Sequence, residues 1–482
     1  MSEAHGVVFP QVDGRRSTSA TGRSVVADAL RGVDPIGAAA VERETNWRRG
    51  YVEHFGRLVV AELTSEDAAG RIAADGLTSL AARLQWSGPD GVRPIDHAFD
   101  SPVQDPLGTE VVTGSGERVA SLSIPYRGAR LAGDGLRRQL AAWVAAGVIE
   151  PSAQEAVCRV LDHPQWLDLS GRTVVVLGAA AEMGPLRSLL RWGADVAAVD
   201  LPRPAVWQRV LDEAGHGAGR VHVPVTLGKS GNLADRAGGD LIQDLPRVAA
   251  WVAGLPGDLV LGNYVYADGA TNVRVAMAVD ALGEHLARQR ETALAFLATP
   301  TDVFAVPGAA VEASVESYAR RRTSKLLRVP LRTLSGGRLL RRNYLPGADP
   351  GINDAIVPQQ GPNYLLAKRL QRWRATTARA AGQTVSFHVA PPTRTRSVVK
   401  NRALAAAYGG AHRFGIEVFE PGTANSLMAA LLVHDLNHGA PAHPMPWQDE
   451  AYAAVHGGLW RAAYAPRSAL GLAALLGIGS AR

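Results

Sequence analysis

The stretch at residues 172–201, RTVVVLGAAAEMGPLRSLLRWGADVAAVDL, constrains the fold of this chain more than any other. It opens with a continuous apolar run at 173–177, which is typical of a strand buried on both faces of a parallel sheet. A glycine turn and a helical pattern of apolar residues follow, and a second apolar run at 194–199 ends in Asp200. Strand, glycine turn, helix, strand and acidic residue, in this order, open a dinucleotide-binding unit.

The glycine turn carries a hypothesis of its own. Gly178 and Gly184 would let the backbone approach a pyrophosphate, and the start of the next helix offers free N–H groups. Asp200 lies 22 residues after Gly178, close to the roughly 20 expected for a carboxylate that binds a ribose hydroxyl. Glu182 stands near the place of the usual middle glycine, and its carboxylate would repel a phosphate unless it points away. A structural βαβ unit without a ligand is therefore the alternative interpretation.

Composition excludes several classes of protein. The only cysteine among the 482 residues, Cys158, leaves no disulfide framework or cysteine-based zinc site and favours a cytoplasmic location. We recognise no signal peptide, and no apolar stretch approaches the roughly 20 residues of a membrane span. The net charge of +6 is modest, so we expect no nucleic-acid partner. His434 and His438 are spaced like metal ligands, but nothing nearby completes a ligand set, and we expect no metal site.

The hydrophobic pattern divides the chain into three parts. Residues 1–165 are expected to form a mainly helical N-terminal domain, which could serve in packing or in forming an oligomer. Residues 166–445 alternate strands and helices, which predicts an α/β fold with a doubly wound parallel sheet, the Rossmann arrangement. A basic insertion at 307–361 interrupts this domain. Residues 446–482 form a C-terminal extension.

The coarse secondary structure follows from the same pattern. Further parallel strands are expected at 220–225, 258–262, 294–298 and 384–389. Helices are expected at 272–290, 363–381 and 423–435. Within the N-terminal region, a hairpin is expected to join strands at 110–113 and 118–124 across the turn sequence GSGE.

The helix expected at 363–381 carries the clearest chemistry. Tyr364 and Lys368 are four residues apart and therefore lie on one helical face. An ammonium near a phenol favours the phenolate, which lowers the pKa of the phenol and lets it exchange a proton with a carbonyl or alcohol. A Tyr-x-x-x-Lys pair alone is weak evidence, but its place after the fifth strand of a dinucleotide fold strengthens it.

With these elements in place, residues from about 170 to 436 resemble the short-chain dehydrogenase/reductase superfamily. Within it, the region is most similar to the ketoreductase region of type I fatty acid synthases. The matching segments are GAAAEMG at 178–184, Asp200, DLVLGN at 258–263, YLLAK at 364–368 and VSFHVAPPTRT at 385–395.

The resemblance implies roles for individual residues. Tyr364 would be the general acid/base, and Lys368 would lower its pKa and hold the nicotinamide ribose. The residues implied in cofactor binding are Gly178, Met183, Gly184, Asp200, Asn263, Thr393 and Thr395.

One departure from the family concerns a serine that the family places about a dozen residues before the tyrosine. Gly351 and Ile352 stand there in this chain. If the segment after residue 307 is an insertion, the place of that serine at the end of the fifth strand falls to Thr299 or Thr301. Either hydroxyl could bind a carbonyl oxygen.

The resemblance and the residues favour different nicotinamide cofactors. The synthase ketoreductases favour NADPH, whereas the carboxylate of Asp200 would repel a 2′-phosphate and favours NAD(H). Arg203 could still reach such a phosphate. NAD(H) is therefore the preferred cofactor and NADP(H) the alternative.

These observations predict an NAD(P)-dependent oxidoreductase that moves hydride between nicotinamide and a carbonyl or alcohol carbon. The substrate would be a small molecule or an acyl thioester such as a 3-oxoacyl group. Glu182 and the missing serine motivate one alternative, a scaffold that kept the fold and lost the reaction. An epimerase or dehydratase that retains NAD is another.

The segment 320–342 holds nine Lys and Arg residues and no acidic residue. A basic surface exposed to solvent or to another domain is the simpler interpretation. The sharper one is an anion site for the phosphate of coenzyme A or of an acyl carrier protein.

Overall fold

The computed structural model describes residues 5–12, 14–320 and 325–480. At its centre lies a seven-stranded sheet in the order β16-β13-β12-β9-β10-β11-β6. Neighbouring strands run parallel except β6, which is antiparallel to β11. The seven strands are β6 (Leu107–Thr113), β9 (Arg172–Leu177), β10 (Asp195–Val199), β11 (Arg220–Thr226), β12 (Asp258–Asn263), β13 (Thr292–Ala298) and β16 (Val385–Val389). This confirms the α/β class and all six expected parallel strands, in an order compatible with the Rossmann arrangement.

Strand β9 shows why a continuous apolar run forms the centre of the sheet. Val174 and Val176 pack into the core on one face, and Val175 and Leu177 pack into the core on the other. All four side chains are fully buried. Because both faces of the strand are covered, a polar side chain on it would lose its hydration, which costs free energy unless the side chain finds a hydrogen-bond partner.

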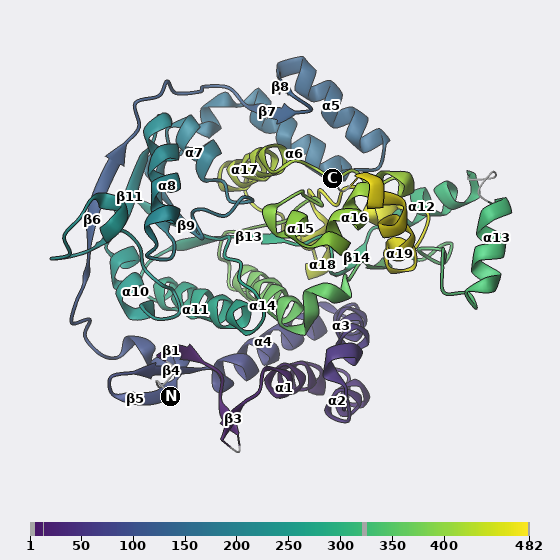
Figure 1. Ribbon diagram of the computed structural model, residues 1–482, viewed down its shortest axis with the longest axis horizontal. Coiled ribbons are helices and arrows are strands. Elements are labelled where there is room, and N and C mark those ends of the chain that lie inside the picture. Colours follow the sequence, from purple (N-terminus) through teal and green to yellow (C-terminus); the bar gives the residue numbers. More distant parts are fainter. Residues whose placement is uncertain (1–4, 13, 321–324, 481–482) are drawn as a thin grey trace.

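Helices cover both faces of the sheet (Figure 1). One face carries α10 (Leu245–Ala253), α11 (Ala270–Ala287) and α14 (Gly361–Ala380). The other face carries α7 (Leu186–Trp192), α8 (Pro204–His216) and α17 (Pro421–His438). A short helix, α9 (Leu233–Arg236), follows β11. None of the helices in the described ranges is long and apolar enough to cross a bilayer.

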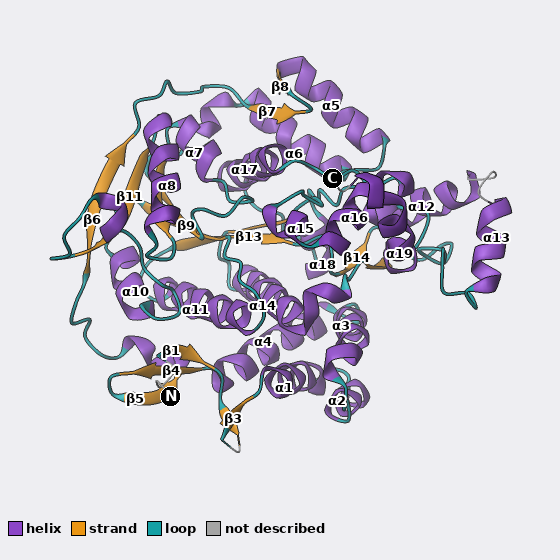
Figure 2. Cartoon of the chain, viewed as in Figure 1, coloured by secondary structure: helices purple, strands orange, loops and turns teal. Residues whose placement is uncertain are grey.

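The N-terminal helices form outer layers on both sides, and their packing crosses the expected boundary at residue 165. On one side α3 and α4 contact α14, and on the other side α6 contacts α17 (Figure 2). The helices are α1 (Thr18–Arg31), α2 (Pro35–Glu42), α3 (Trp47–Glu62), α4 (Glu66–Arg83), α5 (Gly133–Ala145) and α6 (Pro151–Asp162). The smaller strands are β1 (Gly6–Val8), β2 (Gln11–Val12), β3 (Arg15–Arg16), β4 (Gln85–Gly88), β5 (Gly91–Pro94), β7 (Ser123–Tyr126) and β8 (Ala129–Ala132). Each of the two main hydrophobic cores therefore joins N-terminal residues to the central sheet.

The expected hairpin between 110–113 and 118–124 is wrong. Strand β6 pairs along its whole length with β11, more than a hundred residues later, and β7 pairs with β8 instead. The turn sequence after β6 docks on the end of α8, where the amides of Gly114 and Gly116 donate to the carbonyls of Gly219 and Gly217. The glycines here allow the backbone to approach the end of α8 closely, and they do not form a hairpin turn.

Between β13 and α14 the chain makes an excursion. Strand β14 (Val303–Val306) leaves and β15 (Gly351–Asp354) returns antiparallel to it. Between them lie α12 (Gly308–Arg320) and α13 (Lys325–Leu334), and α13 projects from the body (Figure 1).

The last elements are α15 (Arg396–Lys400), α16 (Arg402–Gly410), α18 (Pro446–Ala451) and α19 (Pro466–Gly477). Helices α16 and α19 pack closely because glycines lie at their crossing. A Cβ on Gly410 would lie 2.0 Å from the carbonyl oxygen of Ala473, and one on Gly477 would lie 1.9 Å from that of Ala406. The C-terminal extension is therefore fixed against the segment that follows β16.

Candidate functional site

Tyr364 lies in the first turn of α14, at the edge of the sheet where the parallel strands end. It is partly buried, and burial raises the pKa of its phenol to about 12. The nearby Thr299 side chain opposes this rise in the phenol pKa, and the carboxylate of Asp302 adds to it. At neutral pH the phenol therefore carries its proton.

Lys368 lies one turn later on the same helix. Its Nζ donates to the carbonyl oxygen of Leu297 at 3.1 Å and to Oε1 of Gln371 at 3.2 Å. Burial lowers the pKa of the ammonium to about 8, although Asp302 opposes this shift. The role of Lys368 in lowering the pKa of Tyr364 stays a prediction, while burial alone moves the pKa of the phenol upward.

The two threonines proposed in place of the serine lie together beside Tyr364. Thr299 and Thr301 share a hydrogen bond of 2.8 Å between their hydroxyls, and Thr301 donates to Oε1 of Gln360 at 2.9 Å. Of the two, Thr299 is the one whose side chain lies near enough to Tyr364 to lower its pKa. Gly351, in contrast, lies on β15 and pairs with Val306. The excursion from β14 to β15 thus separates Tyr364 in sequence from a hydroxyl that is its neighbour in space.

The glycine turn follows β9 as expected. Gly178 has φ +81°, and a Cβ there would lie 3.0 Å from the carbonyl oxygen of Tyr264, so a larger residue would be strained and crowded. The amide of Gly184 donates to the carbonyl of Ala181 at 3.0 Å. Met183 packs against the core on the α17 face.

Asp200 joins the end of β10 to this turn. One carboxylate oxygen accepts from the backbone N–H of Ala180 at 2.8 Å and the other accepts from that of Leu201 at 2.8 Å. Burial raises the pKa of Asp200, and these two bonds oppose the rise. Each oxygen retains a lone pair, so the carboxylate can still accept a bond from a hydroxyl.

Glu182 connects the glycine turn to the loop after β16. Its Oε2 accepts from the backbone N–H of Arg396 at 2.8 Å, and its Oε1 lies 3.4 Å from Nε of Arg396. Its carbonyl oxygen accepts from Nδ2 of Asn425 at 3.1 Å. A guanidinium therefore compensates the carboxylate that replaces the middle glycine. A small hollow, lined by Met183 and Leu297 among others, lies nearby.

The remaining residues expected to bind the cofactor are more dispersed. Thr393 is buried, and its hydroxyl donates to the carbonyl of Pro391 at 2.9 Å. Thr395 begins α15, and its hydroxyl lies 2.9 Å from that of Ser397. Asn263 ends β12, and its buried Oδ1 has no hydrogen-bond partner among the described residues; Asn263 and Gln371 line the same hollow. Asn263 therefore lies on the side of the sheet that carries Gln371, the partner of Lys368.

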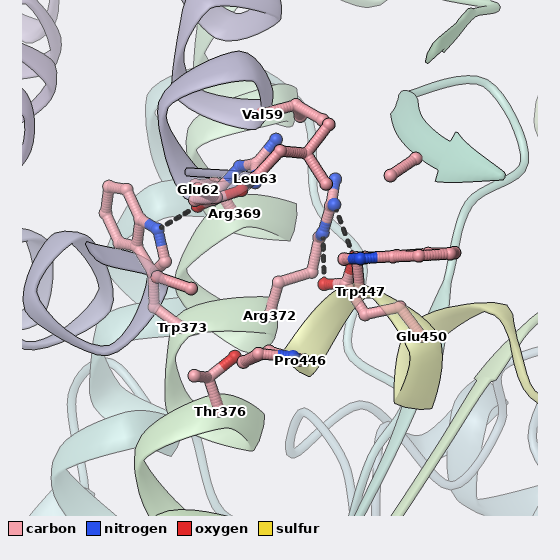
Figure 3. A pocket seen from close by; sticks show the side chains of 12 residues that line it. Val59, Glu62, Leu63, Arg369, Arg372, Trp373, Thr376, Pro446, Trp447 and Glu450 are labelled. Carbon is pink, nitrogen blue, oxygen red and sulfur yellow. Dashed lines mark hydrogen bonds and ion pairs between the residues drawn. The ribbon is translucent and has the colours of Figure 1, made fainter. Parts of the chain in front are cut away.

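A buried ionic cluster occupies the next turns of α14 (Figure 3). Arg372 binds both oxygens of Glu450 at 2.6 Å and reaches Asp302 at 3.2 Å. Arg369 binds Glu62 on α3 at 3.0 Å. Nothing in the sequence pattern indicated these partners, because Arg369 and Glu62 lie 307 residues apart and Arg372 and Glu450 lie 78 residues apart. Asp302 belongs both to this cluster and to the surroundings of Tyr364 and Lys368.

The structure bears on two further hypotheses, a metal site at His434 and His438 and an anion site in the basic segment 320–342. In the described part of the chain no group of three or more His, Cys, Asp or Glu side chains could hold a metal ion. His434 instead shares the buried carboxylate of Asp435 with His388, at 3.0 and 2.7 Å.

Part of the basic segment 320–342 is engaged within the chain. Arg320 pairs with Glu316 at 2.7 Å, and the guanidinium of Arg342 lies 4.7 Å from the centre of the Tyr318 ring. Residues 321–324 lie outside the described ranges.

Comparison with known proteins adds no family. No protein-family model matches the chain, and no curated protein matches it. The resemblance to short-chain reductases therefore remains an expectation from the sequence segments named above.

Proposed function

We propose that this chain is an NAD(P)-dependent oxidoreductase with a doubly wound Rossmann sheet, acting between a carbonyl and an alcohol. One observation carries the proposal: a phenol, a hydroxyl and an amine converge where the parallel strands end. Tyr364 lies near Thr299 at the end of β13, and Lys368 binds the backbone of the same strand. The winding of the sheet reverses between β9 and β12, and open α/β sheets bind their ligands at such a point.

The residues around the glycine turn fit a dinucleotide. Gly178 has the positive φ that this turn requires, and Met183 and Gly184 complete the turn at which a pyrophosphate would bind. The carboxylate of Asp200 retains lone pairs for a ribose hydroxyl and would repel a 2′-phosphate, which favours NAD(H) over NADP(H). Arg396 compensates the charge of Glu182 while the two loops stay joined.

The chemistry of the chain's own residues follows from their protonation. Bound nicotinamide would supply or accept the hydride. Tyr364 is protonated at neutral pH because its pKa is about 12, so it is ready to donate a proton to a carbonyl oxygen. Thr299 can hydrogen-bond the same oxygen and orient it. The arrangement therefore favours reduction of a carbonyl at neutral pH.

Replacement of the phenol tests the proposal. In Tyr364→Phe the proton donor is lost, and we expect turnover of a carbonyl panel with NADH to fall roughly 10²–10⁴-fold while NADH affinity is retained. Tyr266→Phe is the matched control, because its ring packs against that of Tyr364 at 6.1 Å while its hydroxyl binds Asp268. Turnover would be followed by NADH absorbance. Equal rates for Tyr364→Phe and the unchanged protein would refute the assignment.

A scaffold without catalysis is the second candidate, favoured by the contact between Glu182 and Arg396. This contact joins the two loops that a dinucleotide would separate. Calorimetry with NADH and with NADPH distinguishes the two candidates. The oxidoreductase proposal expects binding, stronger for NADH, whereas heat from neither cofactor would favour the scaffold.

A further inference from the structure

A hollow that opens to solvent lies beside the candidate catalytic hydroxyl of Thr301. Helices α16 and α19 and the segment after β15 form its walls. Most of its lining is aliphatic, including Ile356, Val357, Ala407, Ala469, Leu470 and Ala473. Burial of a hydrocarbon group against such walls is favourable because it removes apolar surface from water.

Two residues with hydroxyl groups, Thr301 and Tyr408, also line the hollow, and Thr301 links it to the candidate catalytic residues. The hydroxyl of Thr301 lies 2.8 Å from that of Thr299, whose side chain in turn lies near Tyr364. The phenols of Tyr408 and Tyr364 are close enough to interact electrostatically, and together with burial this raises the pKa of Tyr408. A ligand in the hollow can therefore present its polar end to Tyr364.

The charge of the lining argues against an ionic ligand. Arg467 is the charged residue of the lining, and its guanidinium binds Asp354 at 2.6 Å. A carboxylate or phosphate in this hollow would have to compete with that pair and would be desolvated against aliphatic side chains. An uncharged ligand meets neither cost.

We propose that this hollow binds the hydrocarbon portion of an uncharged ketone or secondary alcohol and directs its oxygen toward Thr299 and Tyr364. The inference rests on the proposed function and names the substrate class. It depends on α19, which lies outside the region that resembles the short-chain reductases. The C-terminal extension thus completes the substrate site by closing it with helix α19.

Binding can be measured without turnover. A neutral naphthalene ketone dye, whose emission shifts in apolar surroundings, would be displaced by a series of 2-alkanones in the absence of cofactor. We expect affinity to rise about fourfold for each added CH₂ group until the hollow is filled. Affinity that is independent of chain length would overturn the inference.

Two variants test whether the ketones bind in the hollow. Ala469→Phe fills the hollow and should weaken displacement at least tenfold for the longest ketone that the unchanged protein accepts. Leu470→Ala enlarges it and should move the plateau to longer chains, a result that remains informative if Ala469→Phe does not fold. Leu475→Ala is the matched control, since Leu475 lies on the same helix with 63% of its surface exposed. Plateaus that coincide for Leu470→Ala and Leu475→Ala would also overturn the inference.

The failures of the two proposals are distinguishable. Ketone turnover without any dependence on chain length would overturn the substrate assignment and leave the oxidoreductase standing. Chain-length-dependent displacement in a protein that binds neither NADH nor NADPH would overturn the oxidoreductase and leave a site for uncharged apolar ligands.

Discussion

The two sides of the candidate site are held in different ways. On the α14 side, Tyr364 and Lys368 precede a cluster in which Arg372 is 3% exposed and Asp302 is 2% exposed. On the glycine-turn side, the contact between Glu182 and Arg396 is partly open to solvent, with the two side chains 29% and 66% exposed. Both sides face the end of the same sheet, yet one is fixed by buried charges and the other by a pair at the rim.

The two sides of the site differ in the free energy needed to break their ion pairs and move the segments that they hold. A partly exposed ion pair contributes about 0–1 kcal/mol, so the loops joined by Glu182 and Arg396 can separate at little cost. Removing one partner of a buried pair costs roughly 3–5 kcal/mol, because the other charge is left without compensation. We infer that α14 stays in place during any reaction and that the glycine-turn side opens to admit a ligand.

The largest effect should come from the buried cluster. Arg372→Met would leave Asp302 and Glu450 buried without their partner, and we expect it to lower the free energy of unfolding by about 3–5 kcal/mol in urea titrations. Arg320→Met is the matched control, since Arg320 and Glu316 form an exposed pair and its loss should cost at most about 0.5 kcal/mol. Similar losses in both variants would show that α14 is not fixed by its buried charges.

The contrast also explains what the sequence could predict. The strands of the sheet were recognisable because continuous apolar runs are required wherever both faces are covered, as in β9. Thr299 could be named because it ends a predicted strand. The pairing of β6 with β11 and the contact of Arg372 with Glu450 could not, since each joins segments far apart in the chain. Neither contact leaves a periodic or local signal.

The same limit applies to electrostatics. Spacing placed Tyr364 and Lys368 on one face correctly, but it could not reveal that burial raises the pKa of the phenol and lowers that of the ammonium. Asp302 and Tyr408 escaped prediction because their importance comes from their surroundings. Residue type and spacing identify candidate groups, whereas desolvation decides their charge.

A medium effect is expected from the amine of Lys368. Its pKa is about 8 in the folded chain and 10.5 in the unfolded chain, so between these values the unfolded chain binds more protons. The free energy of unfolding of the native protein should therefore rise with pH across this window, by up to about 3 kcal/mol. Lys368→Met should abolish that rise. Below pH 8 both states are protonated, and the slope should be equal in the two proteins.

Lys400→Met controls for the loss of an ammonium, because Lys400 is exposed on α15. We expect its unfolding profile to keep the slope of the unchanged protein. Urea titrations at closely spaced pH values would measure the three profiles. A slope that survives in Lys368→Met would mean that another group titrates there, and that the α14 side owes less to burial of its amine than the geometry indicates.

The smallest effect tests the glycine-turn side and bears most directly on function. Glu182→Gly removes the carboxylate and its contact with Arg396, so a dinucleotide would no longer separate that contact on binding. We expect NADH affinity, measured by calorimetry, to rise up to about fivefold, which corresponds to at most roughly 1 kcal/mol. Glu182→Gln separates charge from contact, since its amide oxygen can still accept from the N–H of Arg396, and it should give an intermediate gain. A loss of affinity in both variants would reverse the interpretation, because the pair would then hold the loops in the form that binds the cofactor.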